Sequence, residues 1–103
     1  MAYKVLGQVN PVASTLTTLY TSVGQTVCST LAACNQGPST NIRIAVRPAG
    51  EAIDPKHYVV NDTFINQGDT LWLTVGFTLA ATDVVSVLAG TASVSFNLFG
   101  SEA

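Results

Sequence analysis

Residues 70–99 show the clearest alternation of hydrophobic and polar positions in the chain. In residues 70–79 the apolar side chains fall on every second position from Leu71 to Leu79, and residues 92–99 alternate in the same way. A period of two is typical of a strand that packs one face against a core. Residues 84–89 lie between these runs and are almost all apolar. We therefore predict three strands, joined by short turns as an antiparallel meander.

Five earlier segments also have strand patterns, separated by Gly, Pro, Asn and Asp residues of the kind that form turns. We predict strands at residues 3–9, 15–21, 26–35, 41–47 and 56–60, a turn at 61–62 and a short bridge at 64–65. About eight short, evenly spaced strands predict an all-β fold. We expect a single antiparallel β-sandwich over residues 1–103 that is jelly-roll-like. The immunoglobulin arrangement, with a Trp between two distant Cys, does not fit, because Trp72 follows both Cys.

The alternation also predicts which side chains face the core. In residues 41–47 the expected inward positions are Ile42, Ile44 and Val46, and the outward ones are Arg43, Ala45 and Arg47. In residues 26–35 one face carries Val27, Ser29, Leu31 and Ala33, and the other carries Cys28, Thr30, Ala32 and Cys34. Both faces of this second strand are small and fairly apolar. We expect burial on both of its sides, with the Cys28, Thr30 and Ala32 face against another subunit.

Composition adds a surface that is poor in charge. Charged residues are only 10% of the chain, against about a quarter in ordinary domains. Thr, Ser, Asn and Gln take their place, and such a β-rich surface is poorly protected against association. We therefore expect copies of the chain, or a partner, to cover much of it. A net charge of −2, with four scattered Lys and Arg residues, argues against binding to nucleic acid.

The sequence contains no signal for a membrane. Met1 leads directly into a short alternating run without the apolar region of a signal peptide, and no apolar stretch is long enough to span a bilayer. We expect a chain that is made in a cytoplasm, stays soluble and has no membrane partner.

The two cysteines, Cys28 and Cys34, are predicted to be buried free thiols. On a straight strand their Cα atoms would be about 20 Å apart, whereas a disulfide needs less than about 7 Å. Two Cys and one His also fall short of a tetrahedral metal site. No phosphate-binding glycine loop or calcium-binding loop is present. We expect no metal and no cofactor.

Catalysis is not expected either. His57 is the only histidine, and Asp54 is its nearest acidic neighbour in sequence, but no nucleophile motif accompanies them. The acidic residues are spread over predicted loops and are expected to be turn residues, because Asp and Asn side chains accept local backbone hydrogen bonds. Tyr3, Tyr20, Tyr58 and Trp72 could form a platform for sugars, but a place in the core or at a subunit interface is the better interpretation.

Five residues are candidates for binding a partner. Arg43 and Arg47 share a strand face, roughly 13 Å apart. They could meet acidic groups on a neighbouring subunit, or they could be solvated charges that guard the strand. Lys56, His57 and Tyr58 are expected at a strand edge on a surface or interface.

The chain resembles a group of small virion structural proteins of tailed bacteriophages, including cyanobacterial phages. The resembling segments cover most of the chain and comprise residues 1–8, 16–21, 42–50, 56–58, 78–87 and 95–100. The resemblance concerns overall pattern and carries no catalytic signature. Some proteins of this kind look like capsid decoration or cement proteins, β-rich trimers that sit on the outer shell.

The resemblance implies a non-enzymatic cement protein on the capsid exterior, a homotrimer bound to the major capsid protein. The alternative is a tail or fibre module that binds a glycan or receptor on the host surface. An enzyme such as a glycan hydrolase is a third, weaker hypothesis. We expect contact with the shell through the sandwich body and loops, with residues 100–103 as a minor clasp.

Overall fold

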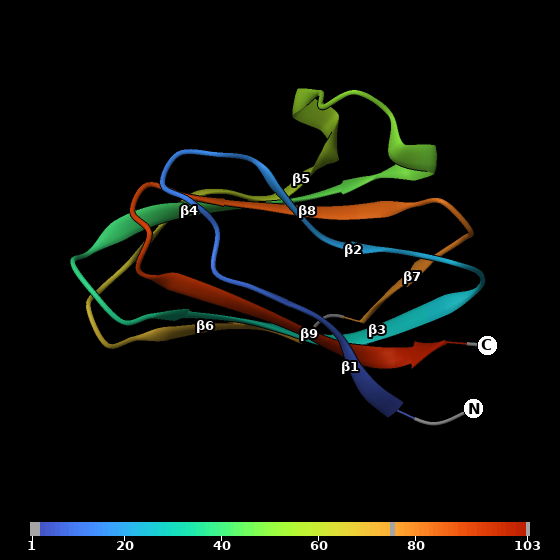
Figure 1. Ribbon diagram of the computed structural model, residues 1–103, viewed down its shortest axis with the longest axis horizontal. Coiled ribbons are helices and arrows are strands. Elements are labelled where there is room, and N and C mark those ends of the chain that lie inside the picture. Colours follow the sequence, from blue (N-terminus) through green and yellow to red (C-terminus); the bar gives the residue numbers. More distant parts are fainter. Residues whose placement is uncertain (1–2, 75, 103) are drawn as a thin grey trace.

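The computed structural model describes residues 3–74 and 76–102, which form two antiparallel sheets packed face to face (Figure 1). The strands are β1 (Tyr3–Val9), β2 (Thr17–Thr21), β3 (Thr26–Asn35), β4 (Thr40–Arg47), β5 (Tyr58–Ile65), β6 (Thr70–Leu73), β7 (Phe77–Leu79), β8 (Val84–Ala89) and β9 (Val94–Glu102). Two short 3-10 turns, η1 (Pro48–Gly50) and η2 (Pro55–His57), interrupt the connection from β4 to β5. The predicted all-β sandwich is confirmed.

The topology is that of a jelly roll. One sheet has the order β1-β9-β3-β6, with β7 also paired to β3, and the other has the order β2-β8-β4-β5. Both β6 and β7 pair with β3 at different points along its length, so together they form one interrupted edge strand. Counted in this way, eight strands make two four-stranded sheets, and the chain passes repeatedly from one sheet to the other, as in jelly rolls.

The predicted meander over residues 70–99 is wrong. β6 and β7 lie in the first sheet, β8 lies in the second, and β9 returns to the centre of the first. A period of two shows that one face of a strand is buried, but it does not show in which sheet the strand lies. Residues 70–79 are also not one strand. β6 ends at Leu73, β7 begins at Phe77, and Gly76 between them has a φ of 66°. The expected inward position Val75 lies outside the described residues.

The core lies between the sheets and includes Phe96, Leu31 and Leu98 from the first sheet and Ile42 and Ile44 from the second. The predicted inward face of β4 is confirmed, since Ile42 and Ile44 are fully buried and Val46 packs against the same cluster.

The predicted faces of β3 are wrong at its start. Cys28 is fully buried between the sheets, whereas Val27 is 38% exposed on the outside. The register of β3 against β9 shifts between Cys28 and Thr30. Such a bulge adds one residue to a strand and reverses which residues face inward on either side of it. Leu31 and Ala33 therefore share the core face with Cys28, and a subunit interface on the outer face cannot include Cys28.

The predictions for residues 56–65 also need correction. Lys56 and His57 belong to η2, not to a strand, and His57 is buried with 5% of its surface exposed. β5 then runs through the predicted turn at residues 61–62 as far as Ile65. Asp62 has a φ of 52°, and the register against β4 shifts beside it. A local turn signal in Asn61 and Asp62 thus marks an irregularity within an edge strand.

The last strand is longer than predicted. β9 reaches Glu102, and residues 100–102 pair with β1 and β3, so they are part of the sheet and not a loose clasp. A Cβ at Gly100 would lie 2.2 Å from the carbonyl oxygen of Val27. Only glycine allows β9 to lie this close to β3 at that point.

Candidate functional site

The candidate partner-binding residues all lie on β4, on β5 or on the connection between them, at the outer side of the β2-β8-β4-β5 sheet. Arg43 donates from Nε to Asp62 Oδ1 at 2.6 Å and from Nη2 to Asp62 Oδ2 at 3.0 Å. Its guanidinium lies 5.6 Å from the centre of the Tyr58 ring. The hydrogen bonds from Arg43 lower the pKa of the Asp62 carboxyl. Because both partners are partly exposed, this pair fixes geometry more than it adds stability.

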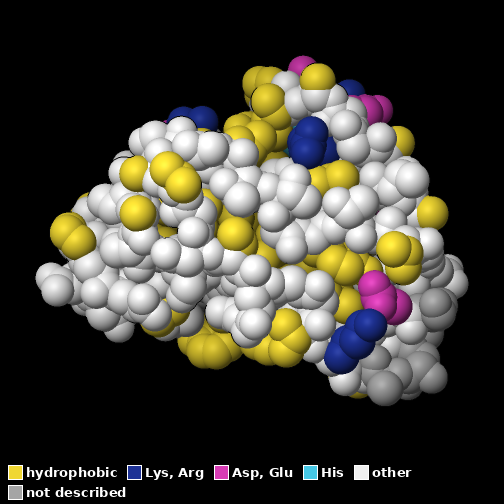
Figure 2. All heavy atoms as spheres, in the orientation of Figure 1, with side chains coloured by type: hydrophobic (Ala, Val, Ile, Leu, Met, Phe, Trp, Pro, Cys, Tyr) yellow, Lys and Arg dark blue, Asp and Glu magenta, His cyan; other side chains and the backbone are white. Residues whose placement is uncertain are grey.

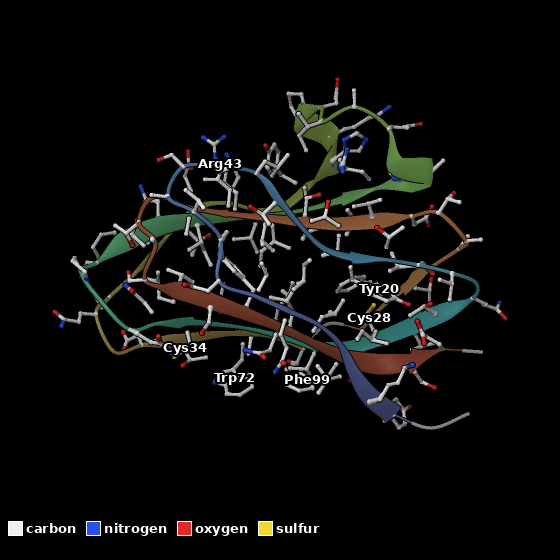
Figure 3. The ribbon with its side chains drawn as sticks, in the orientation of Figure 1. Tyr20, Cys28, Cys34, Arg43, Trp72 and Phe99 are labelled. Atoms are coloured by element: carbon white, nitrogen blue, oxygen red, sulfur yellow. The ribbon has the colours of Figure 1, made fainter. Side chains whose placement is uncertain are left out.

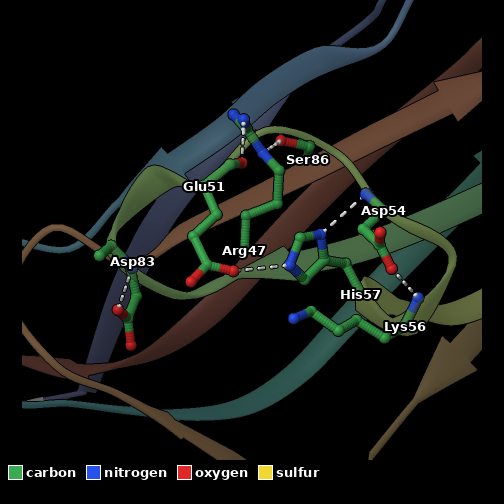
Figure 4. A network of polar contacts seen from close by, with 8 residues as sticks. Arg47, Glu51, Asp54, Lys56, His57, Asp83 and Ser86 are labelled. Atoms are coloured by element: carbon green, nitrogen blue, oxygen red, sulfur yellow. Dashed lines mark hydrogen bonds and ion pairs between the residues drawn. The ribbon is translucent and has the colours of Figure 1, made fainter.

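Arg47 is also engaged within the chain. Figure 4 shows its guanidinium between Ser86 of β8 and the backbone of Glu51. Nε donates to Ser86 Oγ at 3.2 Å, and Nη1 donates to the carbonyl oxygen of Glu51 at 2.9 Å. These bonds attach residues 48–57 to the sheet, which is why Ser86 is buried although it lies on the outer face.

His57 holds that same connection from inside. Its Nδ1 accepts a hydrogen bond from the backbone N–H of Asp54 at 3.0 Å, and its Nε2 lies 3.2 Å from Glu51 Oε1 (Figure 4). The Asp54 carboxylate in turn accepts from the backbone N–H of Lys56, which completes a capping box around η2. Since Nδ1 accepts, Nε2 carries the proton and donates to Glu51. Both ring nitrogens are occupied, and Lys56 is the only one of the five candidate residues that is exposed.

The structure therefore places the five candidates on one side of the molecule, but most of them form interactions that stabilise the fold itself. Arg43, Arg47 and His57 each bond to residues of this chain. Lys56 and Tyr58 flank them. What the group can do chemically is hold residues 48–57 as a rigid cover over the sheet. Among the residues described, no three His, Cys, Asp or Glu side chains gather as a metal site would require.

The opposite side of the sandwich is different, and sequence analysis missed it. We call the outer side of the β1-β9-β3-β6 sheet the open face. The strand registers align its outward residues in rows across the strands: Tyr3, Ser101, Val27 and Thr78 in the first, Val5, Phe99 and Thr30 in the second, and Gln8, Asn97, Ala32 and Trp72 in the third. Of the outward positions on these strands in residues 3–74 and 76–102, none carries a charged side chain.

Large apolar side chains lie exposed on the open face. Tyr3 is 76% exposed, Val5 is 48% exposed and Trp72 is 62% exposed. In Figure 3 the side chains of Trp72 and Phe99 point away from the sandwich, and in Figure 2 hydrophobic side chains gather along the edge of the molecule below this sheet. Trp72 is therefore not a core residue. The sequence signal for this exposed face was the presence of apolar residues at both odd and even positions of β1. Because of the register shift between Val5 and Gly7, alternation alone does not show which of them point outward.

A shallow hollow of about 410 Å³ lies where the end of β1 meets β9. Gln8, Asn10, Ser95 and Asn97 supply most of the polar groups around it. A second hollow, of about 510 Å³, lies between the turn at residues 24–25 and residues 78–83. Neither hollow contains a histidine, a cysteine or a basic side chain.

Cys28 and Cys34 are free thiols, as predicted, although Cys34 is only partly buried. Burial raises the pKa of the Cys28 thiol to about 11. None of the helical turns in the described part of the chain is long or apolar enough to cross a bilayer. No protein-family model, curated protein or solved structure matches this chain.

Proposed function

We propose that this chain is a structural protein of a phage particle, a cement or decoration protein that binds the outer surface of the major capsid protein lattice. In this proposal it acts as a homotrimer on the capsid exterior and performs no catalysis. The sequence resemblance first suggested this role. The observation that carries it on the structure is the open face, whose described outward positions carry no charged side chain and include large, exposed apolar ones.

The part of the open face suited to the lattice is what we call the apolar end, formed by Tyr3, Val5, Val27 and Phe99. These residues come from β1, β9 and β3, which lie side by side at the centre and edge of one sheet. Burying exposed apolar side chains against a partner contributes roughly 25 cal/mol per Å². No charge has to be desolvated on this surface, which favours a close, dry contact.

Stabilisation of the shell follows from linkage. A protein that binds the assembled lattice but not its free or unfolded subunits shifts the equilibrium toward the assembled state. Such a protein must keep its own shape while bound. The jelly roll fits that requirement, because its two sheets share one continuous core, Arg47 attaches residues 48–57 to the sheet, and His57 holds that segment together internally.

The test mixes purified protein with shells that lack it. Light scattering gives the mass of the free protein, sedimentation with the shells gives binding, and calorimetry gives the melting temperature of the shell. We expect a trimer that binds and raises that temperature. Val27→Asp places a carboxylate in the apolar end and should abolish binding, whereas Val59→Asp, at a 55% exposed position on β5, should not.

A wild-type protein that leaves the shells untouched would overturn the proposal and turn attention to the phage tail and its receptor. Equal loss of binding in both variants would show that the apolar end is not the contact.

A further inference from the structure

The third row of the open face combines one exposed aromatic ring with a pair of side-chain amides. Gln8 on β1, Asn97 on β9, Ala32 on β3 and Trp72 on β6 are aligned by the strand registers. We call these four residues the amide row. Adjacent strands are about 4.8 Å apart, so the backbones at Asn97 and Trp72 are separated by about 10 Å. Ala32 lies between them and is only 6% exposed, because neighbouring side chains cover it.

The two amides orient each other through one hydrogen bond, and each has a further group that a ligand could bind. Gln8 Nε2 donates to Asn97 Oδ1 at 2.6 Å. That bond sets which end of each amide points where, so the Asn97 NH₂ group and the Gln8 carbonyl oxygen remain for other partners. Neither group has a further bond within residues 3–74 and 76–102. Both amide side chains line the 410 Å³ hollow and add hydrogen-bond donors and acceptors to it.

Trp72 supplies the other half of a binding site. Its ring is 62% exposed on an edge strand and points away from the sandwich (Figure 3). Leaving a large aromatic surface in water is unfavourable, and stacking a flat apolar partner on it lowers the free energy. Ala32 on one side is small, and Thr70, two residues before Trp72, is a short polar residue, so the ring is accessible from above.

We propose that the amide row binds a neutral oligosaccharide. The C–H face of one sugar ring would stack on Trp72, and hydroxyl groups of the next sugar would accept from Asn97 and donate to Gln8. Sugar hydroxyls both donate and accept, which matches a paired NH₂ and carbonyl group. The absence of charged side chains from the outward positions described on this face suits a ligand without charge.

A protein surface fits the row less well. It would have to desolvate the free amide groups of Gln8 and Asn97 and supply matching partners at both, or lose affinity. The row also offers only one large apolar side chain, whereas the centre of a protein interface is formed by several. The apolar end of the open face is the better protein contact, and the two regions are separate rows of the same sheet.

The inference goes beyond the proposed function and does not depend on it. The experiment titrates the full chain with maltotetraose, cellotetraose and tri-N-acetylchitotriose, each up to about 10 mM, where even weak sites are occupied. Trp72 is the only tryptophan in the chain, so its fluorescence reports the site directly. Isothermal titration calorimetry then measures affinity in variants that lack the reporter. We expect at least one sugar to change the fluorescence and to release heat.

Trp72→Ala should weaken binding by about tenfold or more, and Asn97→Leu should weaken it by a similar factor while keeping the fold. The matched control is Phe64→Ala, which removes an equally exposed aromatic ring, 63% exposed, from the other sheet. It should leave the affinity unchanged.

Absence of fluorescence change and heat with all three sugars would overturn the proposal, as would equal affinity in wild type and Trp72→Ala. Self-association that Trp72→Ala abolishes, without sugar binding, would reassign the row to a contact between copies. Loss of shell binding in Val27→Asp with sugar binding retained would separate this site from the lattice contact.

Discussion

Glu102 joins two neighbouring strands to the end of β9. Its carboxylate pairs with Lys4 of β1 at 2.5 Å and accepts a hydrogen bond from the hydroxyl of Tyr20 on β2. Both bonds lower the pKa of Glu102 below its ordinary value, and the bond from Lys4 has the larger effect. Burial is the main reason that the pKa of Tyr20 is raised. The ionised carboxylate is therefore favoured in the folded chain.

The first prediction is a loss of stability in acid that depends on Glu102. Because the folded pKa is below the unfolded value of about 4.3, the contribution is complete above that value and is lost as the pH falls through the folded pKa. Thermal melts from about pH 6 down to about pH 2 should show a steeper fall in melting temperature for wild type than for Glu102→Gln. Parallel curves for the two proteins would contradict this assignment.

The two thiols should react very differently. Cys28 is fully buried in the core and its pKa is raised, so little thiolate forms near neutral pH, whereas Cys34 is partly exposed on β3. Iodoacetamide at pH 8 should label Cys34 in the native protein and label Cys28 only in denaturant. Mass spectrometry of the peptides distinguishes the two sites. Rapid native labelling of Cys28 would show that the sheets separate readily.

Residue-scale chemistry was only partly predictable from sequence. The free thiols and the inward face of β4 followed from spacing and alternation. The partners of His57 did not, because a capping box depends on the turn that Pro55 starts and not on any periodic pattern. The alternation of residues 70–79 does place Trp72 on the face opposite Leu71 and Leu73. The interpretation of Trp72 as a core residue was wrong, and its place at a subunit interface stays a prediction.

At the scale of elements, β9 is held by close backbone contact. It pairs with β1 on one side and with β3 on the other. Gly100 lies where a side chain would meet the backbone of both Val27 and Cys28, within 2.9 Å. Backbone atoms cannot move aside as the end of a flexible side chain can, so this position tolerates no Cβ without a shift of the sheet.

Gly100→Ala should therefore destabilise the fold by about 1–3 kcal/mol, the usual cost of overpacking a close site. Gly24→Ala is the matched control, because a Cβ there meets nothing within 4 Å and the backbone is compatible with alanine. Urea denaturation followed by Trp72 fluorescence measures both. Equal midpoints for the two variants would show that β9 and β3 adjust more easily than their spacing implies.

Strand positions were predicted better than strand partners. The alternation located most strands to within a few residues, but it placed β8 and β9 side by side in a meander. They lie in different sheets because the turns at residues 80–83 and 90–93 cross the sandwich. Bulges caused the remaining errors. One on β3 reversed the faces of Val27 and Cys28, and one on β5 concealed a strand behind a turn signal.

At the scale of the whole molecule, the two sides of the sandwich have different characters. The β2-β8-β4-β5 side carries Arg43, Asp62 and the bonded cover of residues 48–57. The β1-β9-β3-β6 side is uncharged over its described outward positions. Both sides expose apolar side chains, including Phe64 and Val59 on the β2-β8-β4-β5 side, so the difference between them lies in charge.

Removal of residues 100–103 tests how far the chain ends hold the molecule together. The deletion takes away the pairing of residues 100–102 with β1 and β3 and the Glu102 bonds to Lys4 and Tyr20. We expect a melting temperature lower by several degrees or more, as about 1 kcal/mol shifts it by roughly 4–8 °C in a domain of this size. Loss of shell binding in this variant would then reflect loss of fold. An unchanged melting temperature would show that these pairings add nothing.

The central place of β9 has a consequence for synthesis. β1 leaves the ribosome long before β9, yet β9 is its partner in the sheet and also separates β1 from β3. The first sheet cannot close until residues 94–102 have left the exit tunnel. Until then β1 and β3 expose unpaired edges and apolar side chains, which is the state in which β-rich chains aggregate. The first sheet of the nascent chain therefore forms only after β9 is synthesised, and conditions that slow the synthesis of residues 94–102 should lower the yield of soluble protein.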